Sequence, residues 1–112
     1  MNSEKKELKK ADRLQKEGLR WFAAKMLVKL QLRNKRVGTD EQQQGTLLGQ
    51  KKKCDIWWYY RRLKGETTEL QSALKRHGIH CNEVTRDAVI SEACDVANFA
   101  AAVAEKAVED TR

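Results

Sequence analysis

The sequence predicts an all-α fold, a helical bundle of one domain, from three features. The chain has 112 residues, no proline and six glycines. Apolar residues make up 40% of it and charged residues 35%, a balance typical of amphipathic helices and not of a disordered chain or a β-sandwich. A domain of this size buries less than about 70% of its unfolded surface, so we expect oligomerisation to complete the bundle.

The first predicted helix covers the basic N-terminal segment. Apolar residues recur there at nearly helical spacing, namely Leu8, Ala11, Leu14, Leu19, Phe22, Met26 and Leu30. Gly18 is a weak point that can split this helix and set off residues 1–18 as a basic helical arm. Residues 33–45 have no periodicity and contain two glycines and three consecutive glutamines, which predicts a loop, and residues 34–53 are interpreted as a loop or insertion.

The second predicted helix contains the aromatic stretch WWYY at residues 57–60. It is expected to start between Thr46 and Asp55 and to end at His77, where Gly78 would supply a left-handed C-terminal cap. A short turn and a third helix follow. Asn82 or Thr85 can cap that third helix, which is expected to run to about Asp110.

The apolar segment at residues 88–104 raises the question of a membrane. It is too short to span a bilayer, and each of its two carboxylates would cost about 2.5 to 3.5 kcal/mol there. Three cysteines without CxxC spacing and an N-terminus without an apolar signal core point to a reducing compartment. We therefore expect a soluble, cytoplasmic protein with no membrane partner.

Acidic residues inside apolar helical faces are the main functional signal. On the second helix, Glu66 lies in an apolar stripe and Glu69 borders the same face. On the third, Glu92 and Asp95 have the same spacing of three residues. Both pairs lie about 12 Å from the turn of an antiparallel hairpin, so they are expected to meet across it.

Four carboxylates in a poorly hydrated groove repel one another unless a cation intervenes. An all-oxygen ligand set favours Mg²⁺, or Mn²⁺, over zinc, and Mg²⁺ commonly binds substrate phosphates as well. The sequence therefore predicts a metal site at Glu66, Glu69, Glu92 and Asp95. Spacing alone is weak support, because chance gives about two acid-x-x-acid pairs in such a composition, and it is the apolar context that distinguishes these two.

These residues also resemble a known family. The pair Glu66-x-x-Glu69, separated by 22 residues from Glu92-x-x-Asp95 and followed by the stretch DVANF, is similar to the ExxE…ExxD signature of the MazG-like all-α nucleoside triphosphate pyrophosphohydrolases, which include the dimeric dUTPases. The likeness covers residues 56–104. It departs from the family pattern at Gly65, where a further acid is common, and at the insertion of residues 39–53.

The resemblance implies a helical bundle that binds Mg²⁺ through the four acids and hydrolyses a nucleoside triphosphate to the monophosphate and pyrophosphate. One of the acids, Glu69 in our interpretation, would act as general base. A homodimer or homotetramer is expected, and nucleic acid is not required.

Other candidates have two interpretations each. Asn98 can orient a substrate or pack between helices, and Phe99 can contact a base or lie in the core. Lys35 and Arg36, or Lys51 to Lys53, can hold phosphates or be plain solvated charge. His77, His80 and Cys81 resemble part of a zinc site.

Charge is unevenly distributed along the chain. Residues 1–36 contain twelve Lys or Arg against four Asp or Glu, whereas residues 66–112 contain five against nine. A basic first half can attract nucleic acid or phosphates, or form the solvated face of a helix. The alternative to an enzyme is therefore a basic helical protein that binds nucleic acid through residues 5–36 and 51–62.

Overall fold

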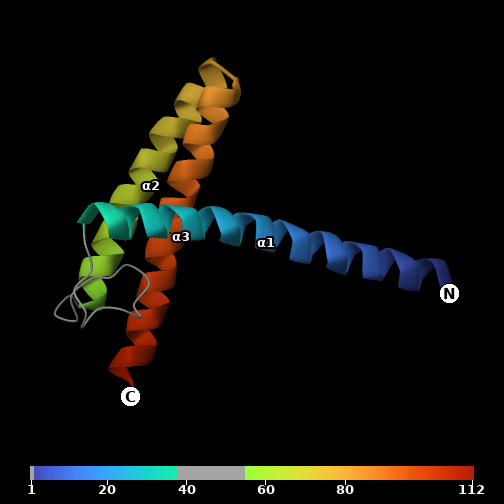
Figure 1. The fold of residues 1–112 in the computed structure, drawn as a ribbon, viewed down its shortest axis with the longest axis horizontal. Coiled ribbons are helices and arrows are strands. Elements are labelled where there is room, and N and C mark those ends of the chain that lie inside the picture. The colour runs from blue at the N-terminus through green and yellow to red at the C-terminus, as the bar shows by residue number, and fades with distance from the viewer. Residues whose placement is uncertain (1, 38–54) are drawn as a thin grey trace.

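The fold is all-helical in the computed structural model, which describes residues 2–37 and 55–112, with the side chains of residues 34–37 left out (Figure 1). The helices are α1 (Asn2–Val37), α2 (Ile56–Ile79) and α3 (Glu83–Asp110). Neither described range contains a strand, which confirms the predicted all-α class. No helix in these ranges has an apolar stretch long enough to cross a bilayer.

Helix α1 is continuous, so Gly18 does not split it into two pieces. Glycine costs a helix only about 1 kcal/mol relative to alanine. Ion pairs one turn apart support the same segment, with Lys16 Nζ 2.9 Å from Asp12 Oδ2. The helix also includes residues 33–37, which the lack of periodicity had predicted as loop; the rest of that predicted loop lies outside the described residues.

Helix α2 begins after Asp55, whose side chain accepts a hydrogen bond of 2.8 Å from the Trp58 amide. Its C-terminal end differs from the prediction. The helix continues through Gly78 to Ile79, and the residue that caps it, His80, has φ −123°, so the left-handed glycine cap is wrong. The cap is replaced by polar contacts, since the Thr85 hydroxyl donates to the His80 carbonyl at 2.6 Å.

Helix α3 begins with a capping box that uses both predicted candidates. The Asn82 side chain accepts from the Thr85 amide at 3.0 Å, and the Thr85 hydroxyl accepts from the Asn82 amide at 3.1 Å. The helix ends at Asp110 as predicted.

Helices α2 and α3 form an antiparallel hairpin, and the C-terminal half of α1 crosses it against α3 (Figure 1). A small core lies at this crossing and contains Leu30, Tyr59, Phe99 and Ala102. The N-terminal half of α1 projects away from the hairpin. The side chains that meet at the crossing therefore come from all three helices.

Candidate functional site

Three of the four predicted acids converge between α2 and α3. One carboxylate oxygen from each of Glu66, Glu69 and Glu92 lies within 4.8 Å of the others, and no other such group of three occurs in the described part of the chain. The hairpin explains the convergence. Glu69 precedes the last residue of α2, Ile79, by ten positions, and Glu92 follows the first residue of α3, Glu83, by nine, so both lie at the same height.

Asp95 lies beside this group with a different partner. Its Oδ2 atom is 3.3 Å from Nζ of Lys29, which α1 brings in as it crosses α3. Asp95 still lines the same pocket as Glu66 and Glu69. The structure thus places three glutamates together and pairs the fourth acid with a cation from α1, a partner that no pattern in the sequence indicated.

Burial and mutual repulsion raise the pKa of two of these carboxyls, Glu66 and Glu92. Burial, then hydrogen bonding to Glu69 and its charge, then the charge of Asp95 raise the pKa of Glu66 to about 7, and Arg62 opposes the shift. Burial, followed by the charges of Glu69 and Asp95, also raises the pKa of Glu92, against the effect of Lys29. The ionised forms of Glu66 and Glu92 are therefore disfavoured, and a further positive charge at the site would favour them.

The donor atoms fit a hard cation. Glu66 is 9% exposed, and its Oε2 atom and Oε2 of Glu92 are buried with no hydrogen-bond partner in the described residues. Ions such as Mg²⁺ take oxygen ligands at about 2.0–2.1 Å, so two ligand oxygens on one ion lie at most about 4.2 Å apart. Small side-chain movements from the observed spacing would bring the three glutamates to that separation. Zinc favours nitrogen and sulfur ligands, which this group lacks.

A pocket of about 300 Å³ opens beside the acids. Acidic, basic and apolar side chains from the three helices line it, namely Lys29, Leu30, Leu32, Arg33, Arg62, Glu66, Glu69, Asp95, Asn98 and Phe99. The mixture of carboxylates and cations in one pocket suits a ligand that carries anionic groups and a bound metal ion.

The basic side chains of this pocket were missed by the sequence analysis. Arg62 Nη2 is 3.8 Å from Glu66 Oε1, and its guanidinium lies 5.4 Å from the centre of the Phe99 ring. Arg33 lies 5.5 Å from the same ring. Arg62 precedes Glu66 by four residues, a spacing that could have been noticed. Arg33 reaches the pocket only because α1 crosses α3, which no local pattern indicates.

Asn98 and Phe99 are both buried, each 3% exposed, and both line the pocket. The Asn98 Nδ2 atom donates to the carbonyl of Met26 at 3.3 Å, which fixes its amide. Its Oδ1 atom has no hydrogen-bond partner in the described residues. The Asn98 amide therefore links α3 to α1 and leaves its oxygen available as an acceptor. The Phe99 ring lies close to the guanidinium groups of Arg33 and Arg62.

The lysines and arginine predicted to bind phosphates fall wholly or partly outside the described residues. Lys35 and Arg36 belong to the last turn of α1, but their side chains fall outside the described residues, as do Lys51 to Lys53 entirely. The substrate contacts predicted for them stay predictions.

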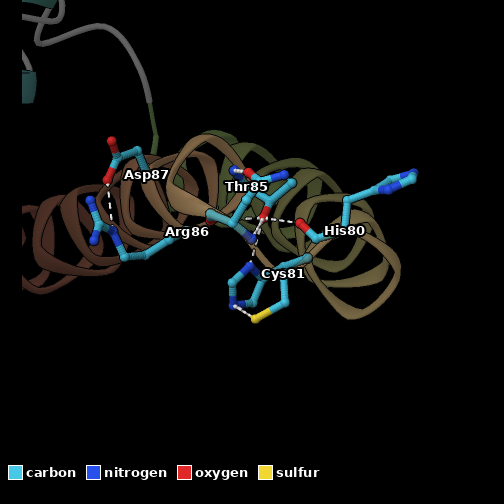
Figure 2. Close-up of polar contacts among 7 residues, drawn as sticks. His80, Cys81, Thr85, Arg86 and Asp87 are labelled. Carbon is cyan, nitrogen blue, oxygen red and sulfur yellow. Dashed lines mark hydrogen bonds and ion pairs between the residues drawn. The ribbon is translucent and has the colours of Figure 1, made fainter.

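The residues that resemble part of a zinc site, His77, His80 and Cys81, belong to a polar network at the hairpin turn (Figure 2). His77 Nδ1 is 2.8 Å from the Thr85 hydroxyl, and His77 Nε2 is 3.7 Å from the Cys81 sulfur. The His80 ring points away from Cys81. These three residues do not form a ligand group, so the zinc interpretation has no support in the structure.

Comparisons of the chain with protein-family models, curated proteins and solved structures give no match.

Proposed function

We propose that the protein is a Mg²⁺-dependent nucleotide pyrophosphohydrolase that cleaves a nucleoside triphosphate, with ribose or deoxyribose, to the monophosphate and pyrophosphate. The main support is the convergence of Glu66, Glu69 and Glu92 beside a pocket that also contains cations. Glu66 and Glu92 each have a buried carboxylate oxygen without a hydrogen-bond partner in the described residues. The MazG-like motif at the same residues supports the same activity.

Glu66, Glu69 and Glu92 would hold the cation, with Asp95 beside them, and Mn²⁺ is an alternative to Mg²⁺. A metal ion of this kind neutralises phosphate charge and lowers the pKa of a bound water. The buried Glu66 and the half-buried Glu92 are suited to ligation, because the Oε2 atom of each is buried and has no hydrogen-bond partner in the described residues. The basic side chains of the pocket, Arg33 and Arg62, would bind phosphate oxygens through their guanidinium donors.

Glu69 is the best candidate for the general base. It lines the pocket and is exposed, whereas Glu66 is buried, so its carboxylate is accessible to water. In the reaction, the oxygen of a water molecule is added to phosphorus, the bond between the α- and β-phosphates breaks, and Glu69 accepts a proton from the water. Pyrophosphate leaves with the electrons of the broken bond.

The decisive experiment is a panel of nucleoside triphosphates scored for release of pyrophosphate, with Mg²⁺, with Mn²⁺ and with chelator. We expect turnover of at least one nucleotide that requires the metal and is lost in Glu66→Gln. An exposed acid at the start of α3, Glu83, provides the control substitution Glu83→Gln, which should keep the activity. Absence of pyrophosphate release from every nucleotide would contradict the proposed activity.

Binding of nucleic acid through α1 is the second candidate. The described lysines and arginines in the N-terminal half of α1 are exposed, and this half projects from the hairpin (Figure 1). Such a surface binds phosphate backbones with strong salt dependence. Salt-sensitive DNA binding that survives the loss of Glu66 and Asp95, without nucleotide turnover, would favour this candidate.

We also propose a homodimer or homotetramer. Large apolar side chains are exposed along α1 and on the hairpin, among them Leu8, Leu14, Leu19, Trp21, Leu27, Trp57 and Ile79. Exposed apolar surface of this extent marks interaction sites in proteins of this size. A second copy that covers α1 would complete the small core.

A further inference from the structure

Lys29 is the ammonium group that α1 brings to the acidic cluster. Its Nζ atom donates to the Ser91 hydroxyl at 2.8 Å and lies 3.3 Å from Asp95 Oδ2. Ser91 and Asp95 are one turn apart on α3, so Lys29 binds one face of that helix beside the glutamates. It also lines the pocket with Glu66 and Glu69.

One of the three N–H groups of the Lys29 ammonium has no partner among the described residues. A lysine ammonium carries three N–H donors, and Ser91 and Asp95 account for two of them. The side chain of Lys29 is 32% exposed and rests on a flexible stem, so its head can move within the pocket without a change in α1. No third partner of this ammonium group occurs among the described residues, so the third donor is available to a ligand in the pocket.

The charges around Lys29 indicate when its ammonium group can bind a ligand. Four carboxylates, Glu66, Glu69, Glu92 and Asp95, face three cations, Lys29, Arg33 and Arg62. Lys29 is the cation that opposes the pKa shift of Glu92 and pairs with Asp95, so it neutralises part of the acidic cluster. A divalent ion on the glutamates would repel this ammonium group and compete with it for Asp95.

We propose that Lys29 positions a phosphate group by exchanging partners: it pairs with Asp95 in the metal-free protein and donates to a phosphate oxygen of the nucleotide when the carboxylates hold the cation. The inference rests on the proposed function and adds a residue from α1 to the substrate site. It also has an unusual consequence. Removing the charge of Lys29 should strengthen metal binding and weaken phosphate binding, whereas a merely structural Lys29 would not move the two in opposite directions.

The test measures two affinities in the full-length protein. Calorimetry with Mg²⁺ alone, and then with inorganic pyrophosphate at saturating Mg²⁺, is applied to the wild type and to Lys29→Met. We expect Mg²⁺ to bind the variant about tenfold more tightly, because a repelling charge near the ion is gone. We expect pyrophosphate to bind it about tenfold more weakly, because a charged hydrogen bond is lost.

The matched control is Lys10→Met, in the N-terminal half of α1. Lys10 is exposed, belongs to the half of α1 that projects away from the hairpin, and is not among the residues that line the pocket. This variant changes the net charge equally, so both of its affinities should equal those of the wild type. Lys29→Arg keeps the charge and should retain most of the pyrophosphate affinity. Lys29→Gln, which can still bond to Ser91, replaces Lys29→Met should the latter not fold.

Three results would overturn the inference. Mg²⁺ affinity that falls or stays constant in Lys29→Met and Lys29→Gln contradicts it, and so does unchanged pyrophosphate affinity. In either case, nucleotide turnover by the wild type would leave the proposed function intact. A wild type that binds no Mg²⁺ and hydrolyses no nucleotide would overturn the proposed function and the inference together.

Discussion

The α2–α3 hairpin and helix α1 contribute to the same pocket in different ways. The hairpin supplies the acids, and their positions follow from helical periodicity and from a turn that sets equal heights on the two helices. Helix α1 supplies Lys29 and Arg33 from a distant part of the sequence. The convergence of the carboxylates can therefore be predicted from the sequence of the hairpin. The positions of Lys29 and Arg33 depend on how α1 crosses α3 and cannot be predicted from local sequence.

The largest expected effect tests the hairpin's part of this comparison. Glu69→Gln removes the proposed general base and the negative charge of one proposed metal ligand, so turnover should fall about 10²- to 10⁴-fold. Steady-state pyrophosphate release measures it, with the exposed acid variant Glu83→Gln as control. Equal activity of the two variants would show that Glu69 has no catalytic role.

The next prediction concerns Asp95, where the two regions meet. Asp95→Asn should also lower turnover by orders of magnitude, since the site loses a charge at the phosphates. The ion pair with Lys29 is partly exposed, with 28% of the Asp95 side chain accessible. Its loss should change the metal-free unfolding free energy by about 1 kcal/mol or less, because screening limits such pairs and the glutamates lose a repelling neighbour.

Melting temperatures with and without Mg²⁺ check this second prediction. The wild type should be stabilised by Mg²⁺, and Asp95→Asn should be stabilised less. A large drop in the metal-free melting temperature of the variant, together with no Mg²⁺ effect on the wild type, would mean that Asp95 serves only to attach α1 to α3.

The third prediction concerns self-association through the N-terminal half of α1, which projects from the hairpin. Leu19 is 71% exposed, and we expect Leu19→Lys to weaken the proposed oligomer and reduce the mass in solution, by up to two- to fourfold for a dimer or tetramer. Light scattering at micromolar concentration measures the mass. The neighbouring exposed residue gives the control Arg20→Ala, which should leave it unchanged. A monomeric wild type would remove the oligomer from the proposal.

The parts that the sequence predicted correctly are governed by local rules. The helical class, the caps of α3 at Asn82 and Thr85 and the position of three glutamates all follow from residues a few positions apart or from one short turn. Gly18, where the sequence allowed a break, does not split α1, because a single glycine costs a helix only about 1 kcal/mol relative to alanine. The roles of Lys29 and of the Met26 carbonyl depend on tertiary packing of α1, and no periodicity encodes that.

The smallest expected effect is a pH dependence that separates the acids of the hairpin from the cations of α1. The pKa of Glu66 is raised to about 7 in the folded protein, whereas a glutamate in the unfolded chain titrates near its ordinary value of 4.5. Between these values the folded state binds more protons than the unfolded state, so the metal-free unfolding free energy falls as pH rises from about 5 through 7. Glu66→Gln removes this titration and should flatten the curve.

Urea denaturation in chelator at several pH values gives the unfolding free energies of both proteins. Glu66→Gln should gain stability relative to the wild type as pH rises, because the neutral amide avoids a buried charge beside Glu69. Saturating Mg²⁺ should stabilise the wild type more at higher pH, since ionised carboxylates bind the ion. Lys29→Met should keep or steepen the metal-free slope, because Lys29 favours the ionised form of the neighbouring Glu92. Parallel curves for the wild type and Glu66→Gln would show that the buried carboxyl at Glu66 does not control the titration of the site.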